Sequence, residues 1–304
     1  MTEKRKRRFG DRKDGYRLKN LADIQIIMPY ALPHRTDNEA VLNESLEFEK
    51  ALEFIKSKNE NRQHENFKYT IFHFLTAAIA KTIYFRPKMN WFIKGHRFYE
   101  RNEISFSFVV KKQFEDTSHE ALAKVVAPSE GEGSLIDGIY EQVRSQVFTV
   151  RKTEKIDETT KKMGVYGKLP RWLLRFVVHC VNVFDYHGWL PTSFTKDDPY
   201  FSTVFMSNLG SIKMNANYHH LANYGTNSVF IIIGEMKKKP VFKDDGTFEM
   251  KNMVDISLTI DERIGDGVYF AKSIKLLRHI IANPQLVDLP IESPVDCDLN
   301  LYNK

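Results

Sequence analysis

The chain is poor in cysteine, with only Cys180 and Cys297 among its 304 residues. Two cysteines cannot form a disulfide framework, and neither has a nearby cysteine or a suitably spaced histidine for a zinc site. A reducing compartment is therefore favoured, and we expect a cytoplasmic protein without a bound metal. No apolar run reaches the roughly 20 residues of a membrane-spanning helix, and no apolar stretch follows the charged N-terminus to make a signal peptide.

Low-complexity segments and internal repeats are also missing. Hydrophobic residues make up 42% of the chain and aromatic residues 12%, which is enough for a packed core and excludes disordered and collagen-like classes. The net charge of +6 is concentrated partly in residues 4–8 (KRKRR). A basic run of this kind can contact nucleic acid or an anionic surface, but the rest of the chain lacks the basic and aromatic interleaving of a nucleic-acid-reading module. We therefore expect no nucleic-acid partner, and we expect residues 1–19 to be a flexible start.

The apolar patterning predicts an alternation of helices and strands. A short strand is predicted at residues 24–28 (IQIIM), stopped by Pro29, and an almost wholly apolar helix at residues 69–85. In the C-terminal third, strands are predicted at residues 202–207, 228–234 and 254–260, with a hairpin turn at Asp244-Asp245-Gly246 and a helix at about 269–281.

An apolar helical segment at residues 171–190 (RWLLRFVVHCVNVFDYHGWL) stands apart from this pattern. Such a helix can line a lipid-like ligand site or lie at a membrane surface. We expect it instead to pack on its own sheet or on a partner subunit, as part of an insertion at about 165–192. Membrane contact is not expected.

Three polar clusters in the C-terminal third carry chemistry-bearing side chains. They are residues 205–211 (FMSNLGS), residues 218–221 (YHHL) and residues 261–267 (DERIGDG). Taken singly, each has an ordinary explanation as a strand end, a pair of surface histidines, or a turn with a helix-capping aspartate.

The order and context of these clusters resemble a known family. The chain is similar to the catalytic core of the dihydrolipoamide acyltransferases of 2-oxo-acid dehydrogenase complexes, which share a fold with chloramphenicol acetyltransferase. The similar segments are residues 75–80 (LTAAIA), 86–90 (RPKMN), 202–210 (STVFMSNLG) with Asn223, 229–234 (VFIIIG), 261–267 and 283–286 (NPQL). The similarity covers most of residues 20–290 and is most specific in the last 90 of them.

The resemblance implies a chloramphenicol-acetyltransferase-like α/β (α+β) fold, a two-layer sandwich of a mixed sheet and packed helices, at residues 20–290, with a C-terminal tail at 291–304. It also implies a homotrimer with the active site between subunits, and coenzyme A or acyl-CoA as a substrate that passes an acyl group to an unidentified acceptor. No lipoyl attachment is expected in this chain, so it is not expected to serve as a working subunit of such a complex.

The resemblance further implies roles for particular residues. Ser207 matches the serine that hydrogen-bonds the tetrahedral oxyanion, and Asp266 matches a structural anchor of its loop, expected to pair with an arginine. Glu262 stands where the family has its catalytic histidine. Substrate-binding positions are implied at Thr203, Asn208, Asn223 and Gly267.

A free glutamate is too weak a base to take the proton of a thiol, because its pKa is about 4.3 and that of the thiol is about 8.5. Glu262 could therefore replace the histidine only if its pKa were raised. Burial can raise the pKa of a carboxyl group by up to about 3–5 units, so a buried glutamate base is physically possible. Two alternatives remain open: His219 or His220 supplies the imidazole, or the protein is an inactive relative that binds a CoA-like ligand, an apolar ligand or a protein partner through the inherited channel.

Overall fold

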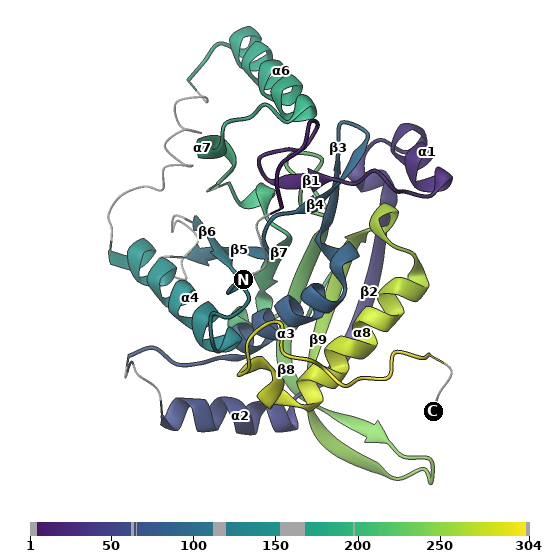
Figure 1. The fold of residues 1–304 in the computed structure, drawn as a ribbon. Helices are drawn as coiled ribbons and strands as arrows, with labels where there is room; N and C mark the ends of the chain where they lie inside the picture. The colour runs from purple at the N-terminus through teal and green to yellow at the C-terminus, as the bar shows by residue number, and fades with distance from the viewer. Residues whose placement is uncertain are drawn as a thin grey trace.

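The computed structural model describes residues 5–61, 64, 66–111, 120–152, 168–196 and 198–301. Its centre is a mixed six-stranded sheet in the order β2-β9-β8-β7-β5-β6 (Figure 1). The strands are β2 (Glu39–Glu47), β5 (Ser105–Lys111), β6 (Glu120–Val126), β7 (Val204–Asn208), β8 (Val229–Phe242) and β9 (Phe248–Asp261). Strand β7 runs parallel to β5 and β8, and the other pairs are antiparallel. A smaller antiparallel sheet joins β1 (Gly15–Arg17), β4 (Arg97–Arg101) and β3 (Trp91–Lys94).

Helices cover one face of the large sheet. Helix α3 (Ile71–Phe85) is buried along most of its length and packs against both α4 (Leu135–Lys152) and α8 (Gly267–Ala282). Helix α2 (Glu49–Glu60) contacts α3 and α8. Because every second residue of β7, β8 and β9 points to this side, the strands contribute Val204, Ile231 and Ile256 to the same apolar core. The predicted two-layer sandwich of a mixed sheet and packed helices is confirmed.

The opposite face of the sheet carries a loop and no α-helices among the described residues, and it is here called the open face. Strands β7 and β8 are parallel neighbours, so the chain must cross over between them. It does so through residues 209–228, and Leu221 of this crossover packs on Phe205, Phe230 and Ile232. The crossover loop thus lies on the open face of the sheet.

Two predictions for the N-terminal part are wrong. Residues 24–28 lie in helix α1 (Asp23–Ala31) and not in a strand, because a short apolar run fits either structure and the helix contains Pro29 in its last turn. The segment predicted as a flexible start supplies β1, and its Arg12 is buried. Arg12 is held there because its guanidinium pairs with Asp14 and Asp185.

The apolar segment forms helix α6 (Arg171–His187), followed by α7 (Thr192–Thr195). Of the two expectations for α6, packing on its own sheet is wrong, since the helix projects from one end of the molecule (Figure 1) and most of its side chains are exposed. Packing on a partner subunit stays a prediction. The first residues of the predicted insertion, 165–167, lie outside the described residues. At the opposite end, β8 and β9 continue beyond the sheet as a hairpin whose turn is the predicted Asp244-Asp245-Gly246.

We predict that His73 makes folding sensitive to acid. This side chain is buried in α3, where desolvation lowers its pKa from 6.5 to about 4. Between these values the unfolded chain binds a proton that the folded chain does not, so stability falls as the pH drops. Lowering the pH from 7 to 5 should therefore cost about 2 kcal/mol through this residue.

Urea unfolding at both pH values measures this effect. The matched control is His73→Gln, because glutamine at this position can still accept the hydrogen bond that the backbone N–H of Thr70 donates to His73 Nδ1. The wild type should lose more stability on acidification than His73→Gln, and equal losses would contradict the prediction.

Candidate active site

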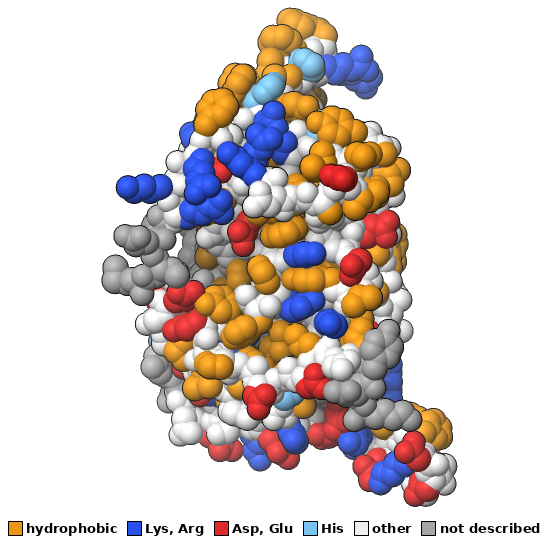
Figure 2. Space-filling model, turned by 45° about the vertical axis from the view of Figure 1, so that its right-hand side comes forward, with side chains coloured by type: hydrophobic (Ala, Val, Ile, Leu, Met, Phe, Trp, Pro, Cys, Tyr) orange, Lys and Arg blue, Asp and Glu red, His pale blue; other side chains and the backbone are white. Residues whose placement is uncertain are grey.

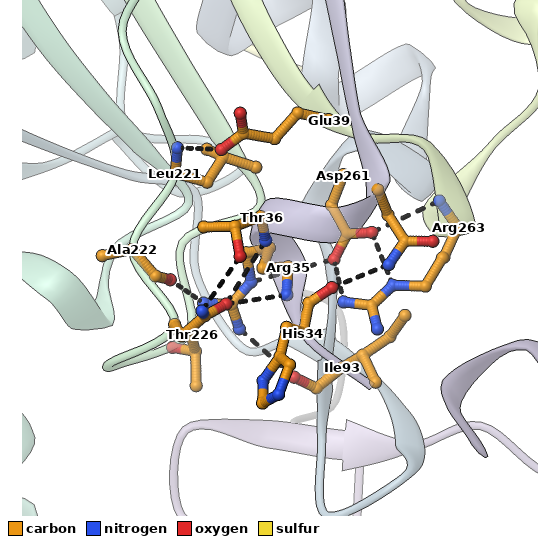
Figure 3. A network of polar contacts seen from close by, with 12 residues as sticks. His34, Arg35, Thr36, Glu39, Ile93, Leu221, Ala222, Thr226, Asp261 and Arg263 are labelled. Carbon is orange, nitrogen blue, oxygen red and sulfur yellow. Dashed lines mark hydrogen bonds and ion pairs between the residues drawn. The ribbon is translucent and has the colours of Figure 1, made fainter. Parts of the chain in front are cut away.

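A buried carboxylate, Asp261, ends strand β9 and organises the surrounding loops (Figure 3). Arg263 forms a bidentate pair with it, with Nε and Nη2 each 2.7 Å from a carboxylate oxygen. Arg263 Nη1 also donates to the carbonyl oxygen of Leu32 at 2.7 Å. Asp261 therefore ties the end of β9 to the segment that follows α1.

A second arginine, Arg35, approaches the same carboxylate at 3.8 Å from the turn η1 (Arg35–Asn38). Its guanidinium donates to the carbonyl oxygens of Ala222, Gly225 and Ile93. Burial lowers the pKa of Arg35 to about 10, although Asp261 acts in the opposite direction. Two buried cations thus share one carboxylate, and one of them, Arg35, holds the end of the crossover loop (Figure 3).

Glu262 follows Asp261 directly but lies in a different environment. It begins the short turn η5 (Glu262–Ile264), and its side chain is exposed. The burial that a glutamate base needs is absent around Glu262 in the described part of a single chain.

Asp266 and Gly267 begin helix α8. Asp266 is the N-cap, and its carboxylate accepts a hydrogen bond from the backbone N–H of Tyr269 at 2.7 Å. Among the described residues no arginine pairs with Asp266, and the carboxylate of this segment that pairs with an arginine is Asp261. Asp266 is still an anchor of its loop, as a helix cap. Gly267 is exposed, with open space around it.

Ser207 lies near the end of β7 on the open face. It is half-buried, and its hydroxyl makes no hydrogen bond to the described part of the chain. Beyond it, Asn208 is exposed and Gly210 packs on β8, where a Cβ atom on Gly210 would lie 2.6 Å from the carbonyl oxygen of Gly234. The glycine therefore lets the chain turn tightly from Ser207 into the crossover loop.

The crossover loop carries His219 and His220. The ring of His219 stacks on Phe230, with centroids 4.0 Å apart, and Phe230 stacks on Phe205 of the neighbouring strand. His219 Nδ1 lies 2.7 Å from the carbonyl oxygen of His220. Because a carbonyl oxygen can only accept, Nδ1 carries the proton and the lone pair remains on Nε2. This is the tautomer that a general base requires.

Strand register separates Ser207 from Glu262 within one chain. Ser207 of β7 pairs with Ile232 of β8, which pairs with Ser257 of β9. Glu262 comes five residues after Ser257, just past the end of β9, which places it roughly 17 Å away along the direction of the strand. Phe230, under His219, is only two residues from Ile232. Its Cα is on the order of 8 Å from that of Ser207, on the same face. The structure thus brings His219, not Glu262, toward Ser207.

The remaining predicted positions make contacts within the chain. Thr203 is buried, and its hydroxyl donates to Asn90 Oδ1 at 2.8 Å. Asn223 Oδ1 accepts from the backbone N–H of Arg35 at 2.8 Å, which fixes the crossover loop to η1. Thr203 therefore supports the site from inside the chain, whereas Asn223 is exposed and joins the crossover loop to η1.

Sequence reasoning missed Asp261, Arg35, Arg263 and Glu39. Glu39 of β2 accepts hydrogen bonds from Tyr218 and from the backbone N–H of Leu221, on either side of the two histidines. The sequence did contain a signal for the buried ion pair: Asp261 stands at the end of an apolar strand, and Arg263 follows two residues later. No cluster of three or more His, Cys, Asp and Glu side chains suited to a metal ion occurs among the described residues.

Comparison with known proteins places these residues in a family context. Residues 192–289 match the family described as 2-oxoacid dehydrogenases acyltransferase (catalytic domain). This range contains Ser207, His219, Glu262 and Asp266. The C-terminal third thus matches the catalytic-domain model of this family, and the resemblance inferred from the sequence is confirmed. No curated protein sequence matches the chain.

Solved structures of the same fold cover nearly the whole chain. A probable dihydrolipoamide acetyltransferase from Listeria monocytogenes has a TM-score of 0.55 at 16% identity, covering 92% of this chain and 98% of its own. The catalytic core of a 2-oxoacid dehydrogenase multienzyme complex from Thermoplasma acidophilum gives 0.53 at 13% identity, covering 88% and 98%. The dihydrolipoamide acetyltransferase of Azotobacter vinelandii gives 0.57 at 15% identity, covering 90% and 95%, and a serine, a histidine and an asparagine have been investigated in its mechanism.

We predict that Asp261→Asn destabilises the protein strongly. The variant leaves the buried guanidinium groups of Arg35 and Arg263 without an anion, and breaking a buried pair in this way costs about 3–5 kcal/mol. The matched control is Asp255→Asn on the same strand, whose carboxylate pairs with Lys239 at a partly exposed site. That change should cost at most about 1 kcal/mol. Urea unfolding of both variants measures the difference, and equal losses would disprove the dominant role of Asp261.

Proposed function

We propose that the protein is an acyltransferase that moves an acyl group from an acyl-CoA thioester to a nucleophilic acceptor. The observation that carries the proposal is that Ser207 and His219 lie on the same face of the sheet, over the neighbouring strands β7 and β8. One presents a hydroxyl without a partner in the described chain, and the other an imidazole nitrogen with a lone pair. Both lie in the range that matches the acyltransferase catalytic domain.

In the proposed reaction, His219 Nε2 removes a proton from the acceptor as its nucleophilic atom attacks the thioester carbonyl carbon. The tetrahedral intermediate carries a negative oxygen, to which the Ser207 hydroxyl donates a hydrogen bond. Collapse of the intermediate breaks the carbon–sulfur bond. The thiolate of CoA leaves and takes the proton back from His219, which regenerates the neutral imidazole.

We further propose a homotrimer with the substrate channel between subunits. The exposure of Glu262 and its distance from Ser207 support this arrangement, because a neighbouring chain would bury a carboxylate that is exposed in a single chain. In this assembly Glu262 borders the channel from the second subunit. Asn208 and Gly267, which are both exposed, are the proposed substrate contacts.

A second candidate is a non-catalytic relative that binds a CoA-like ligand. The glutamate at the position of the family's histidine favours it. In that case the protein would bind CoA but would not catalyse acyl transfer, so substitutions at Ser207 and His219 would have no activity to reduce.

Ser207→Ala should reduce kcat about 10²–10³-fold, because it removes one oxyanion hydrogen bond while leaving substrate contacts in place. The assay is acyl transfer from a panel of acyl-CoAs to dihydrolipoamide, with the melting temperature as a check on folding. An unchanged kcat in a folded variant would remove Ser207 from the mechanism.

His219→Gln should reduce kcat about 10²–10⁴-fold, the usual contribution of a general base. His220→Gln is the matched control, because His220 is the adjacent exposed histidine: its backbone carbonyl accepts from His219, and its ring stacks on that of His219 at 4.7 Å. Its kcat should stay within a few-fold of the wild type.

Mixing variants distinguishes His219 from Glu262. If Glu262 of one subunit were the base for Ser207 of the next, mixed trimers of Ser207→Ala and Glu262→Gln chains would contain one intact site and recover activity. Recovery in that mixture, together with full activity of His219→Gln, would contradict the assignment of His219.

A further inference from the structure

Helix α6 is held to the rest of the protein mainly through its C-terminal turns. The buried carboxylate of Asp185 pairs with Arg12 at 2.8 Å and with Lys94 at 2.6 Å. Burial lowers the pKa of Arg12, but its pairs with Asp14 and Asp185 outweigh this and raise it, so the anchor stays charged. Nearby, the backbone of Tyr186 lies against Gly95, where a Cβ atom would come within 2.4 Å of its carbonyl oxygen.

Beyond this anchor, α6 exposes large apolar side chains. The exposed fraction is 71% for Trp172, 61% for Phe176 and 60% for Trp189, which follows the helix. Val178, Val183, Phe184 and Tyr186 are exposed as well. Single exposed apolar residues are ordinary on a protein surface, but a group of this size marks an interaction site.

The apolar surface continues onto α1. Tyr30 of α1 stacks on His96 with ring centroids 4.5 Å apart, and His96 contacts the ring of Tyr186 at 5.9 Å. Ile24, Ile26 and Ile27 of α1 are exposed. Figure 2 shows hydrophobic side chains gathered over this end of the molecule, with Lys and Arg side chains beside them. The exposed side chains of α1 and α6 are here called the apical surface.

The charges of the apical surface are mostly positive. The exposed charged residues of α6 are Arg171 and Arg175, and its one carboxylate is the buried Asp185. The basic N-terminal segment is held next to it, because Arg7 donates to the carbonyl oxygens of Arg12 and Lys13. Asp23 of α1 is exposed and acidic. Aromatic side chains on a helix with cationic polar residues are typical of segments that lie in the interface of an anionic bilayer.

Length and charge decide how such a surface can be covered. Helix α6 has 17 residues and is about 25 Å long, and the described residues contain no helix long and apolar enough to cross a membrane. A second copy docked face to face would bring two surfaces of the same, mostly positive charge together. An anionic lipid surface instead complements both the charge and the aromatic side chains.

We propose that the apical surface docks the protein onto anionic membranes, with α6 lying in the plane of the interface. This departs from the expectation, drawn from the sequence, that the segment packs on protein. The proposal does not depend on acyl transfer, because the apical surface includes neither Ser207 nor His219.

The test is flotation of the purified full chain with vesicles of phosphatidylcholine alone and of phosphatidylcholine with phosphatidylglycerol. The protein should float with the anionic vesicles and lose affinity as salt is raised, because salt screens the basic residues. The fluorescence of Trp172 and Trp189 should shift to shorter wavelength on binding.

The double variant Trp172→Ser/Phe176→Ser should weaken binding to the vesicles by at least about tenfold, since two aromatic side chains that the bilayer would bury are lost. The matched control is Phe242→Ser/Phe248→Ser at the tip of the β8–β9 hairpin, where the exposed fractions are 71% and 57%. This control pair should bind like the wild type.

Failure of the wild type to float with anionic vesicles overturns the proposal, and so does equal binding by the two double variants. If the wild type does not float and light scattering shows that Trp172→Ser/Phe176→Ser lowers the oligomer mass, a second copy covers the surface. Loss of acyl transfer with normal flotation would count against the proposed function alone.

Discussion

The arrangement of the site depends on one buried charge, the carboxylate of Asp261. It neutralises Arg263 in a bidentate pair and Arg35 at longer range, and these arginines in turn bind carbonyl oxygens after α1, in β3 and in the crossover loop. Buried guanidinium groups are tolerated only where their donors are paired. The crossover loop, with His219 on it, is therefore fixed to the sheet by polar contacts at its far end and by apolar packing of Leu221.

The sequence was most informative where burial produces a regular pattern. Helix α3, strands β7 and β8 and the hairpin turn at Gly246 follow directly from apolar spacing and turn chemistry. It was misleading at residues 24–28, because an apolar pentapeptide before a proline fits a strand as well as a helix end. The helical form of α6 was predictable, but its exposure was not, since apolar residues ordinarily signal burial.

The candidate site was only partly predictable for a different reason. Motif similarity located Ser207, Glu262 and Asp266, but it says nothing of the distance between them. Strand register supplies that distance, and it separates Ser207 from Glu262 by roughly 17 Å along one strand direction. The approach of His219 to Ser207 depends on a crossover loop whose path is set by Glu39, Asn223 and Arg35, far away in the sequence.

The proposed function requires that the open face of the sheet binds a CoA thioester. The most direct measurement is the melting temperature of the full chain with CoA itself, the part common to every acyl-CoA. A ligand at a hundred times its dissociation constant stabilises the folded state by ~2.7 kcal/mol, which corresponds to a rise of about 4 °C for a chain of this size. We expect that rise. An unchanged melting temperature with CoA and with every acyl-CoA tried would contradict it.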